Sequence, residues 1–363
     1  MKERIYICHT YYHVYVTCLK ELLILQDNPI ISKAAIILSS LSTDFGNLRF
    51  RLNESNLFSE IFEYDEKRLS PPAGSNIICN MVKRIIFTKK QAKAQIPYLP
   101  TNFRDYRDIY VYCDSDPIGY YLNWAKIPYH AIEDGLNCLV LFDAAKYDNR
   151  KFFRFKTWMS ARNLIFIQNG YGKYCLDMEV NDISVIENHC PKYIEKSRDE
   201  LVKALNKSSV ELLLNIFITN LQDLTHRLNI NHEIKGKTLI LTEPLSDLET
   251  RKKLFAKIID QYGQLSERET QIIIKPHPMD EVDYQSLFPG HIVLDSKFPM
   301  EILNLVPGLF FDRVVSIFTV PLGIKFAGEI INLGSDFKDD NDDSVFLKEK
   351  LNRYAEEVLL KKS

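Results

Sequence analysis

The sequence predicts an α/β fold built as two domains, and three observations support this prediction. The chain has 363 residues, more than most single domains contain. Short apolar runs typical of buried strands alternate with segments in which apolar residues recur at helical spacing. A second series of this kind begins at Lys237. Alternating strands and helices form mainly parallel sheets, so we expect ligands at the carboxyl ends of the strands.

The first series opens with an apolar strand at residues 4–8, and helical spacing follows over residues 10–25. Asp114 to Pro117 form a turn and helix-start signal, which predicts a helix over residues 117–126. Leucines at helical spacing in residues 193–229 predict helices that connect the two domains. Further strands are predicted at residues 34–39, 59–64, 108–113 and 129–132.

The second series predicts a helix over residues 247–262, a helix that starts near residue 298 and a charged terminal helix over residues 343–361. Its strands are predicted at residues 237–242, 271–275, 291–294, 313–316 and 329–333. We therefore place one α/β domain with connecting helices at residues 1–230 and a second at residues 231–363. We leave open whether the terminal helix packs back on the first domain.

Composition excludes several function classes. The chain has 46 Lys and Arg against 48 Asp and Glu, and a net charge of −2 argues against a dedicated nucleic-acid binder. Its seven cysteines are odd in number and none has C-x-x-C spacing, which indicates reduced thiols rather than disulfides or a zinc site. Without a signal peptide or an apolar run of about 20 residues, we expect a cytoplasmic protein.

Residues 149–165 are basic and aromatic. One interpretation is a solvated amphipathic segment that covers the core. The other is contact with an anionic membrane face or a lipid-linked acceptor, because aromatic and cationic side chains bind such surfaces.

Paired carboxylates follow the strand at residues 129–132, in the sequence Glu133-Asp134-Gly135. Neighbouring like charges and partial burial raise the pKa of a carboxylate, which suits a general base. Gly135 allows a tight turn and leaves room for a substrate. A solvated loop with a helix cap is the structural alternative.

The first strand runs into His9, Thr10 and His13. A polar turn at this position can present Thr10 and backbone amides to a substrate. His9 and His13 are four residues apart and share a helix face, but two histidines alone are a weak signal for a metal. Ordinary packing remains the alternative.

The second domain carries Lys275-Pro276-His277-Pro278 at a predicted strand end. Flanking prolines give His277 a stiff backbone. A neutral histidine that donates a hydrogen bond, or an imidazolium, can stabilise a leaving phosphate. A structural turn is the alternative.

Ser316 and Thr319 stand at the mouth of a predicted helix. Two hydroxyls and the unsatisfied helix amides can hold a phosphate, although Ser316 could simply cap the helix. Glu301, near the start of the preceding helix, can accept hydrogen bonds from ribose hydroxyls or simply favour that helix N-terminus.

Taken in this order, the motifs resemble those of bacterial sialyltransferases, most closely glycosyltransferase family 52, from Ile5 to about Gly323. The resemblance is carried by the acidic-acidic-Gly motif, by His277-Pro278 and by the pair Ser316 and Thr319. It implies a GT-B fold, in which two Rossmann-like domains face each other across a cleft, with residues 1–230 as the acceptor domain and residues 231–363 as the domain that binds the CMP-sugar. It also implies an inverting transfer from CMP-sialic acid to a galactose-type hydroxyl of capsule or lipooligosaccharide.

The resemblance also implies residue roles. Asp134 or Glu133 would activate the acceptor, and His277 would act on the departing CMP phosphate, which Ser316 and Thr319 would hold. Donor binding would further involve Lys275, Pro276, Pro278, Glu301, Thr10 and Glu243. In part of the family the base follows the first strand of the second domain, so Glu243 and Asp247 also remain candidates.

We predict no metal or other cofactor, since one histidine and a helix N-terminus can meet the charge of a leaving monophosphate ester. Asp114 and Asp116 have the spacing of an Asp-x-Asp metal motif but are not predicted to bind one. The alternatives are a GT-B enzyme with another donor such as UDP-glucose, a CDP-glycerol-type polyol-phosphate transferase that uses His9 or His13, and a non-catalytic binding protein. A homodimer and a lipid-linked acceptor are left open.

Overall fold

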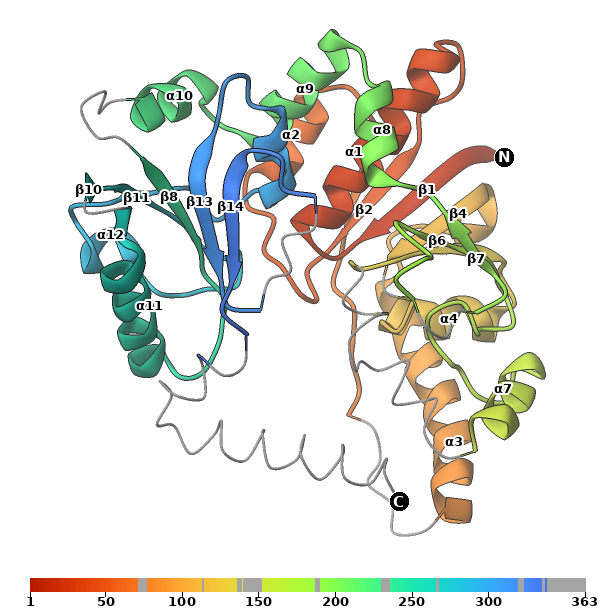
Figure 1. The fold of residues 1–363 in the computed structure, drawn as a ribbon. Helices are drawn as coiled ribbons and strands as arrows, with labels where there is room; N and C mark the ends of the chain where they lie inside the picture. The colour runs from red at the N-terminus through yellow and green to blue at the C-terminus, as the bar shows by residue number, and fades with distance from the viewer. Residues whose placement is uncertain are drawn as a thin grey trace. The chain divides into compact units, whose positions relative to one another are not determined.

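The computed structural model describes residues 1–70, 77–112, 114–135, 139, 152–186, 190–229, 236–265, 268–318, 323–334 and 337 (Figure 1). The chain divides into two compact units, residues 1–217 and 218–363. Sequence analysis placed this boundary at residue 230, because it took all of residues 193–229 as connecting helices.

The first unit alternates strands and helices. Its strands are β1 (Lys2–Cys8), β2 (Ala35–Ser39), β3 (Glu60–Tyr64), β4 (Tyr106–Tyr112), β5 (Tyr129–Ile132), β6 (Cys175–Val180) and β7 (Tyr193–Glu195). Its helices are α1 (Tyr11–Asp27), α2 (Leu48–Glu54), α3 (Ile77–Gln95), α4 (Pro117–Ala125), α7 (Phe153–Ala161), α8 (Arg198–Ala204) and α9 (Lys207–Phe217), with 3₁₀ turns at Ile96–Tyr98 and Phe103–Asp105.

These seven strands form one sheet in the order β3-β2-β1-β4-β5-β6-β7, and every neighbouring pair is parallel. Ile5 of β1 lies opposite Ala35 of β2 and Ile109 of β4, in the buried centre of the sheet. The strand order reverses between β1 and β4. In parallel α/β sheets such a reversal opens a space for ligands at the carboxyl ends of the two strands.

The second unit begins with α10 (Leu221–Asn229) and includes α11 (Leu248–Tyr262), α12 (Tyr284–Leu287) and a 3₁₀ helix, η3 (Met300–Leu305). Five parallel strands have the order β12-β11-β8-β13-β14, with the reversal between β8 and β13. The strands of this unit are β8 (Lys237–Leu241), β11 (Gln271–Lys275), β12 (Ile292–Val293), β13 (Phe311–Ser316), β14 (Ala327–Asn332) and a separate antiparallel pair, β9 (Gln264–Leu265) and β10 (Arg268–Glu269).

Each unit has its own hydrophobic core. In the second unit, Leu254, Phe255 and Ile258 of α11 pack on Ile240 and Val315 of the sheet. Burial of each such side chain contributes roughly 1.5–3 kcal/mol, so each sheet with its covering helices forms a rigid base for the loops at its edge. Four described cysteines are buried thiols, at positions 8, 18, 175 and 190.

Sequence analysis located the strands that precede the site residues but missed β6 and β7. Residues 193–195 form a strand and not a helix, and the leucine-rich stretch after them is divided into α8, α9 and α10. The helix expected near residue 298 is the 3₁₀ helix η3. The terminal helix predicted at residues 343–361 lies outside the described residues, and among those described no helix is long and apolar enough to cross a bilayer.

Candidate active site

The turn between β1 and α1 is built around the N-terminus of the helix. Thr10 is the N-cap of α1, and its Oγ1 accepts a hydrogen bond from the His13 N–H at 3.2 Å. The His9 N–H donates to Nδ1 of His13 at 3.0 Å. Thr10 was predicted to bind substrate, but its hydroxyl is engaged in capping the helix that carries His13.

Asp134 follows β5 and pairs with His13. Nε2 of His13 donates to Oδ1 of Asp134. The His13 side chain is fully buried and stacks on Tyr112 at 4.4 Å between ring centroids, whereas the Asp134 side chain is 33% exposed. Gly135 has a φ of +98°, a backbone conformation that favours glycine, and lets the chain turn directly after the carboxylate.

The contacts of His13 determine its protonation state. Nδ1 accepts a backbone N–H and so carries no proton, which leaves the ring proton on Nε2. Burial lowers the pKa of His13 below its ordinary value, so the ring is neutral at pH 7. A neutral histidine donating to a carboxylate leaves Asp134 the charged, proton-accepting member of the pair.

Glu133 is a buried anchor. Its side chain is 1% exposed and its Oε2 accepts the Asn181 N–H at 3.0 Å. Burial raises the pKa of Glu133, against the opposing effects of Arg198 and of that hydrogen bond. The neighbouring carboxylates therefore have different surroundings: that of Glu133 fixes the loop after β6, and that of Asp134 binds His13 and is partly exposed to solvent.

A buried charge cluster lies beside this pair. Nε2 of His9 is 2.9 Å from Glu66 and 3.4 Å from Asp116, and Arg68 also binds Asp116. Burial would lower the pKa of His9, but the two carboxylates outweigh it and raise that pKa to about 9. Burial raises the pKa of Asp116 to about 6. His9 is therefore an imidazolium that balances carboxylates from the ends of β3 and β4.

The Asp-x-Asp spacing has a structural explanation. Asp114 accepts the backbone N–H of Asn169 at 2.6 Å and the Tyr129 hydroxyl at 3.1 Å, while Asp116 binds His9 and Arg68. Within the part of the chain that the structure describes, no group of three or more His, Cys, Asp or Glu side chains is arranged to hold a metal.

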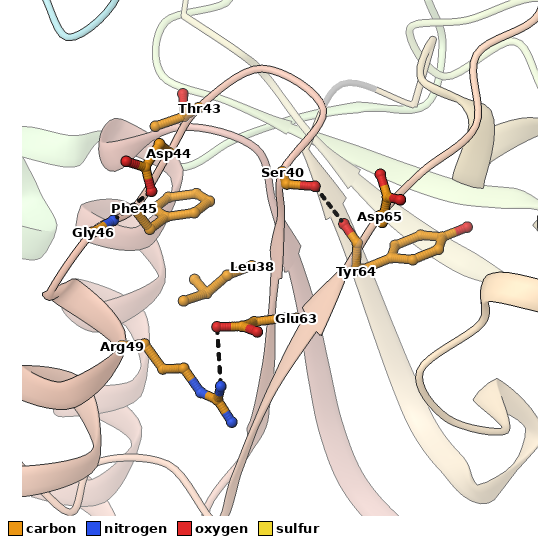
Figure 2. Close-up of a pocket in the computed structure, with 10 residues that line it drawn as sticks. All are labelled: Leu38, Ser40, Thr43, Asp44, Phe45, Gly46, Arg49, Glu63, Tyr64 and Asp65. Atoms are coloured by element: carbon orange, nitrogen blue, oxygen red, sulfur yellow. Dashed lines mark hydrogen bonds and ion pairs between the residues drawn. The ribbon is translucent and has the colours of Figure 1, made fainter.

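A pocket of about 450 Å³ lies at the carboxyl ends of β2 and β3 (Figure 2). Its lining includes three carboxylates, Asp44, Glu63 and Asp65, against the single cation Arg49, which pairs with Glu63 at 3.0 Å. In the sheet order, β1 and β4 lie between this pocket and β5. The pocket therefore contains none of the predicted site residues.

In the second unit, His277 follows β11 in a turn that its own ring stabilises. The Met279 N–H donates to Nδ1 of His277 at 3.1 Å, and the His277 N–H donates to Oγ1 of Thr242 at the end of β8. Burial and the neighbouring Lys275 lower the pKa of His277. As in His13, Nδ1 is an acceptor, so the neutral ring carries its proton on Nε2.

A buried network holds this turn in place. Asp280, whose side chain is fully buried, binds Arg251 at 2.7 Å, the Thr242 hydroxyl at 2.7 Å and the Tyr284 hydroxyl at 2.8 Å. Removal of either member of a buried ion pair leaves an uncompensated charge and costs about 3–5 kcal/mol. The network ties the His277 turn to the end of β8 and to α11.

Lys275 is buried and not open to solvent. Its ammonium donates to the carbonyls of Pro276 and Ser296, both at 3.1 Å, and lies 4.4 Å from the centroid of the Phe298 ring. Burial lowers the pKa of Lys275 to about 7. Pro276 is buried, whereas Pro278 is exposed.

Two of the remaining predicted residues, Glu243 and Ser316, stand at the carboxyl ends of the strands that flank the reversal in this unit. Glu243 Oε1 accepts the Phe318 N–H at 2.9 Å, which joins the ends of β8 and β13. Ser316 is buried at the end of β13, and Thr319 lies outside the described residues. Glu301 is in the first turn of η3, and burial raises its pKa.

Asp247 has a structural function as the N-cap of α11, where it accepts the Thr250 N–H at 3.0 Å and the Thr250 hydroxyl at 2.8 Å. These hydrogen bonds lower the pKa of Asp247. A carboxylate held in this way is a poor proton acceptor.

Residues 80–319 match the model of glycosyltransferase family 52, which covers well over half of the chain. The chain belongs to glycosyltransferase family 52. The short motifs around Asp134 and His277 both lie inside the matched region.

Solved structures establish the fold of this family 52 member. It is similar to a sialyltransferase from Photobacterium damselae, with 13% identity, coverage of 91% of this chain and 90% of that one, and a TM-score of 0.55. It is also similar to a 2,6-sialyltransferase from Photobacterium sp. JT-ISH-224 solved with CMP and lactose, with 13% identity, coverage of 90% and 71%, and a TM-score of 0.56. At these identities the likeness shows the fold, which is GT-B.

A curated relative gives a shorter match. An uncharacterized protein of Haemophilus influenzae is 34% identical over 86 residues, and the match spans about a quarter (26%) of that protein.

Sequence reasoning missed several residues that shape the site of this family 52 protein. His13 was noted but not paired with Asp134, and Glu66, Arg251 and Asp280 were not singled out. Asp280 stands two residues after Pro278, so a carboxylate close to the His-Pro motif was an available signal. Glu66 had no comparable signal.

Proposed function

We propose that this protein is an inverting sialyltransferase that moves sialic acid from CMP-sialic acid to a galactose-type hydroxyl of a capsular or lipooligosaccharide glycan. Its family and its fold, shared with sialyltransferases, support this proposal. One of those enzymes was solved with the donor product CMP and the acceptor substrate lactose, and we extend a CMP-linked donor and a galactose-type acceptor to this chain. The observation that carries the proposal is the pair of Asp134 and His13, a proton acceptor held at the carboxyl edge of a parallel sheet.

In the proposed reaction, the acceptor hydroxyl attacks the anomeric carbon of sialic acid and transfers its proton to Asp134. The bond from that carbon to the CMP phosphate breaks, and CMP leaves with the electron pair. Among the carboxylates left open by sequence analysis, Asp134 is the best base, because Glu133 is buried, Glu243 binds the Phe318 N–H and Asp247 caps a helix.

The second unit is proposed to bind CMP. His277, through Nε2–H, stabilises the negative charge on the departing phosphate, and its tautomer favours hydrogen-bond donation over proton transfer. Ser316 and Thr319 are assigned to the phosphate, and Lys275, Pro276, Pro278 and Glu301 to the cytidine and ribose. Glu243 supports this site through Phe318, and Thr10 supports the acceptor site by capping α1.

CMP release decides between donors. The purified protein is expected to release CMP from CMP-sialic acid when lactose is added, with EDTA present, since the proposed reaction uses no metal. Parallel incubations with UDP-glucose and with CDP-glycerol serve as controls. Turnover of UDP-glucose or CDP-glycerol without turnover of CMP-sialic acid would contradict the donor assignment. Loss of CMP release in the presence of EDTA would contradict the metal-independent mechanism.

The polyol-phosphate transferase alternative is weaker in this structure. It requires a second catalytic histidine, and His9 and His13 are both buried and engaged, His9 with Glu66 and Asp116 and His13 with Asp134.

We also propose that the protein is cytoplasmic and contacts an anionic membrane face through α3 and α7. Met81 and Ile85 of α3 pack on the cluster around Met159 of α7. Arg84 of α3 also donates a 3.1 Å hydrogen bond to the carbonyl of Phe166, in the segment that follows α7. Residues 77–95 and 152–164 contain eight Lys and Arg and no Asp or Glu. Three aromatic side chains are exposed there, those of Phe152, Phe155 and Trp158. The Trp158 ring stacks on that of Phe155, and the Arg162 guanidinium lies 3.9 Å from the centroid of the Trp158 ring.

Vesicle sedimentation tests this surface. The protein is expected to bind vesicles rich in anionic lipid at low salt, and to bind neutral vesicles weakly. Trp158→Ser should reduce binding several-fold, because an interfacial aromatic is lost. Phe50→Ser, which alters an exposed aromatic on α2, is the matched control and should bind like wild type. Equal binding of the wild type to both vesicle types would exclude the proposal.

A further inference from the structure

His13 is held by contacts on several sides. Nδ1 accepts the His9 N–H at 3.0 Å, the ring stacks on Tyr112, and the backbone N–H of His13 is bound by Thr10. Nε2 is directed to Asp134. The ring is fully buried and does not meet solvent, whereas one third of the Asp134 side chain does. Everything that orients this histidine therefore also orients the hydrogen bond that it donates to Asp134.

We propose that His13 is a positioning residue: its Nε2–H holds the Asp134 carboxylate in the orientation that accepts the proton of the acceptor hydroxyl. This inference rests on the proposed function, because it requires Asp134 to be the base. The Asp134 side chain is partly exposed and directly precedes the turn at Gly135, so the hydrogen bond from His13 limits its rotation. Misplacement of a reacting group by about 1 Å can cost about 100-fold in rate.

Charged groups on neighbouring elements surround this pair. His9 before α1 acts on both members, and Asp116 after β4 and Glu133 after β5 act on Asp134. Glu66 after β3 acts on His9 and Asp116, and Arg198 at the start of α8 acts on Glu133. The imidazolium of His9 faces three carboxylates, those of Glu66, Asp116 and Asp134. All five groups remain in place when only His13 is changed, so a comparison of His13 variants isolates the hydrogen bond to Asp134.

Two substitutions separate positioning from packing. In His13→Gln, the side-chain amide nitrogen stands at the same number of bonds from Cα as Nε2, so it can still donate to Asp134. In His13→Asn, the amide oxygen takes the place of Nδ1 and can still accept the His9 N–H, but the side chain is too short to reach Asp134. Each variant therefore keeps one of the two hydrogen bonds of His13.

If His13 positions Asp134, the asparagine variant should lose about 100-fold in kcat, while the glutamine variant should stay within about 10-fold of wild type. KM for the acceptor should change little in either. The acid limb of the kcat/KM profile should move to higher pH in the asparagine variant alone, because a carboxylate that loses a donated hydrogen bond is protonated more easily. Equal losses in both variants, or a greater loss with glutamine, would show that His13 serves only to pack the turn.

Nitrogen chemical shifts of His13 in the wild-type protein give a second readout, independent of activity and of the folding of the variants. A neutral ring protonated on Nε2 is expected at pH 7, and a ring protonated on Nδ1 or on both nitrogens overturns the inference. If wild type releases no CMP from CMP-sialic acid, the proposed function fails, and the chemical shifts still decide whether His13 donates to Asp134.

Discussion

Replacing Asp134 with asparagine is expected to lower kcat for sialyl transfer about 10³-fold. Asparagine keeps the shape of the side chain and can still accept the hydrogen bond from His13, but an amide cannot take the proton of the acceptor hydroxyl. Binding of CMP-sialic acid should be nearly unchanged, because the proposed partner of Asp134 is the acceptor. Steady-state kcat and KM for lactose and the donor, with calorimetric binding of CMP, measure both effects.

Glu133→Gln is the matched control for Asp134→Asn. Glutamine at this position can still accept the Asn181 N–H, so kcat should fall by less than about 10-fold. If Asp134→Asn keeps wild-type kcat while Glu243→Gln or Asp247→Asn abolishes it, the base belongs to the second unit, and the assignment of Asp134 is wrong.

Replacing His277 with alanine is expected to lower kcat about 10²- to 10³-fold, the usual effect of removing one donor from a site that stabilises developing charge. His277→Gln should recover a substantial part of this loss, since its amide can donate from the position of Nε2. Rates of CMP release by the two variants, measured at saturating donor, make this comparison. A glutamine variant as inactive as the alanine variant would instead indicate that His277 transfers a proton.

The pH dependence of kcat also distinguishes hydrogen-bond donation from proton transfer by His277. Burial and the proximity of Lys275 lower the pKa of His277, so its ring is neutral at pH 7 and becomes cationic only as the pH falls. If a neutral His277 donates a hydrogen bond, kcat should not decline through this residue between pH 7 and 8. If an imidazolium at His277 transfers a proton, kcat should decline over that range. Lys275, whose pKa burial lowers to about 7, is expected to add a limb near pH 7 that persists in His277→Gln.

The sequence predicted much of the fold because buried parallel strands leave continuous apolar runs. β1, β2, β8 and β11 were located in this way. β6 and β7 were missed for a physical reason. In β6 (Cys175–Val180) the sequence is Cys-Leu-Asp-Met-Glu-Val, and β7 has three residues near the edge of the sheet, so polar side chains interrupt both apolar patterns.

The sequence indicated candidate site residues where polar residues cluster along the chain, as in the motifs that contain Asp134 and His277. The partners that orient them are distant in sequence: His13 and Asp134 are 121 positions apart, and Arg251 and Asp280 are 29 apart. No periodicity or spacing rule connects such pairs, because the fold alone brings them together. The choice between Glu133 and Asp134 likewise required knowledge of which one is buried.

The different surroundings of the neighbouring Glu133 and Asp134 have a consequence for attempts to change the acceptor. If β5 keeps its pairing, deletion of one residue within it would bring Asp134 to the buried place of Glu133 and Gly135 to the place of Asp134. Insertion of one residue would bring Glu133 to the partly exposed place and carry the proposed base one residue beyond it. Length changes after Gly135 leave both carboxylates at their present distance from β5. Libraries that seek new acceptors should therefore vary loop length downstream of Gly135 and hold residues 129–135 at their present length.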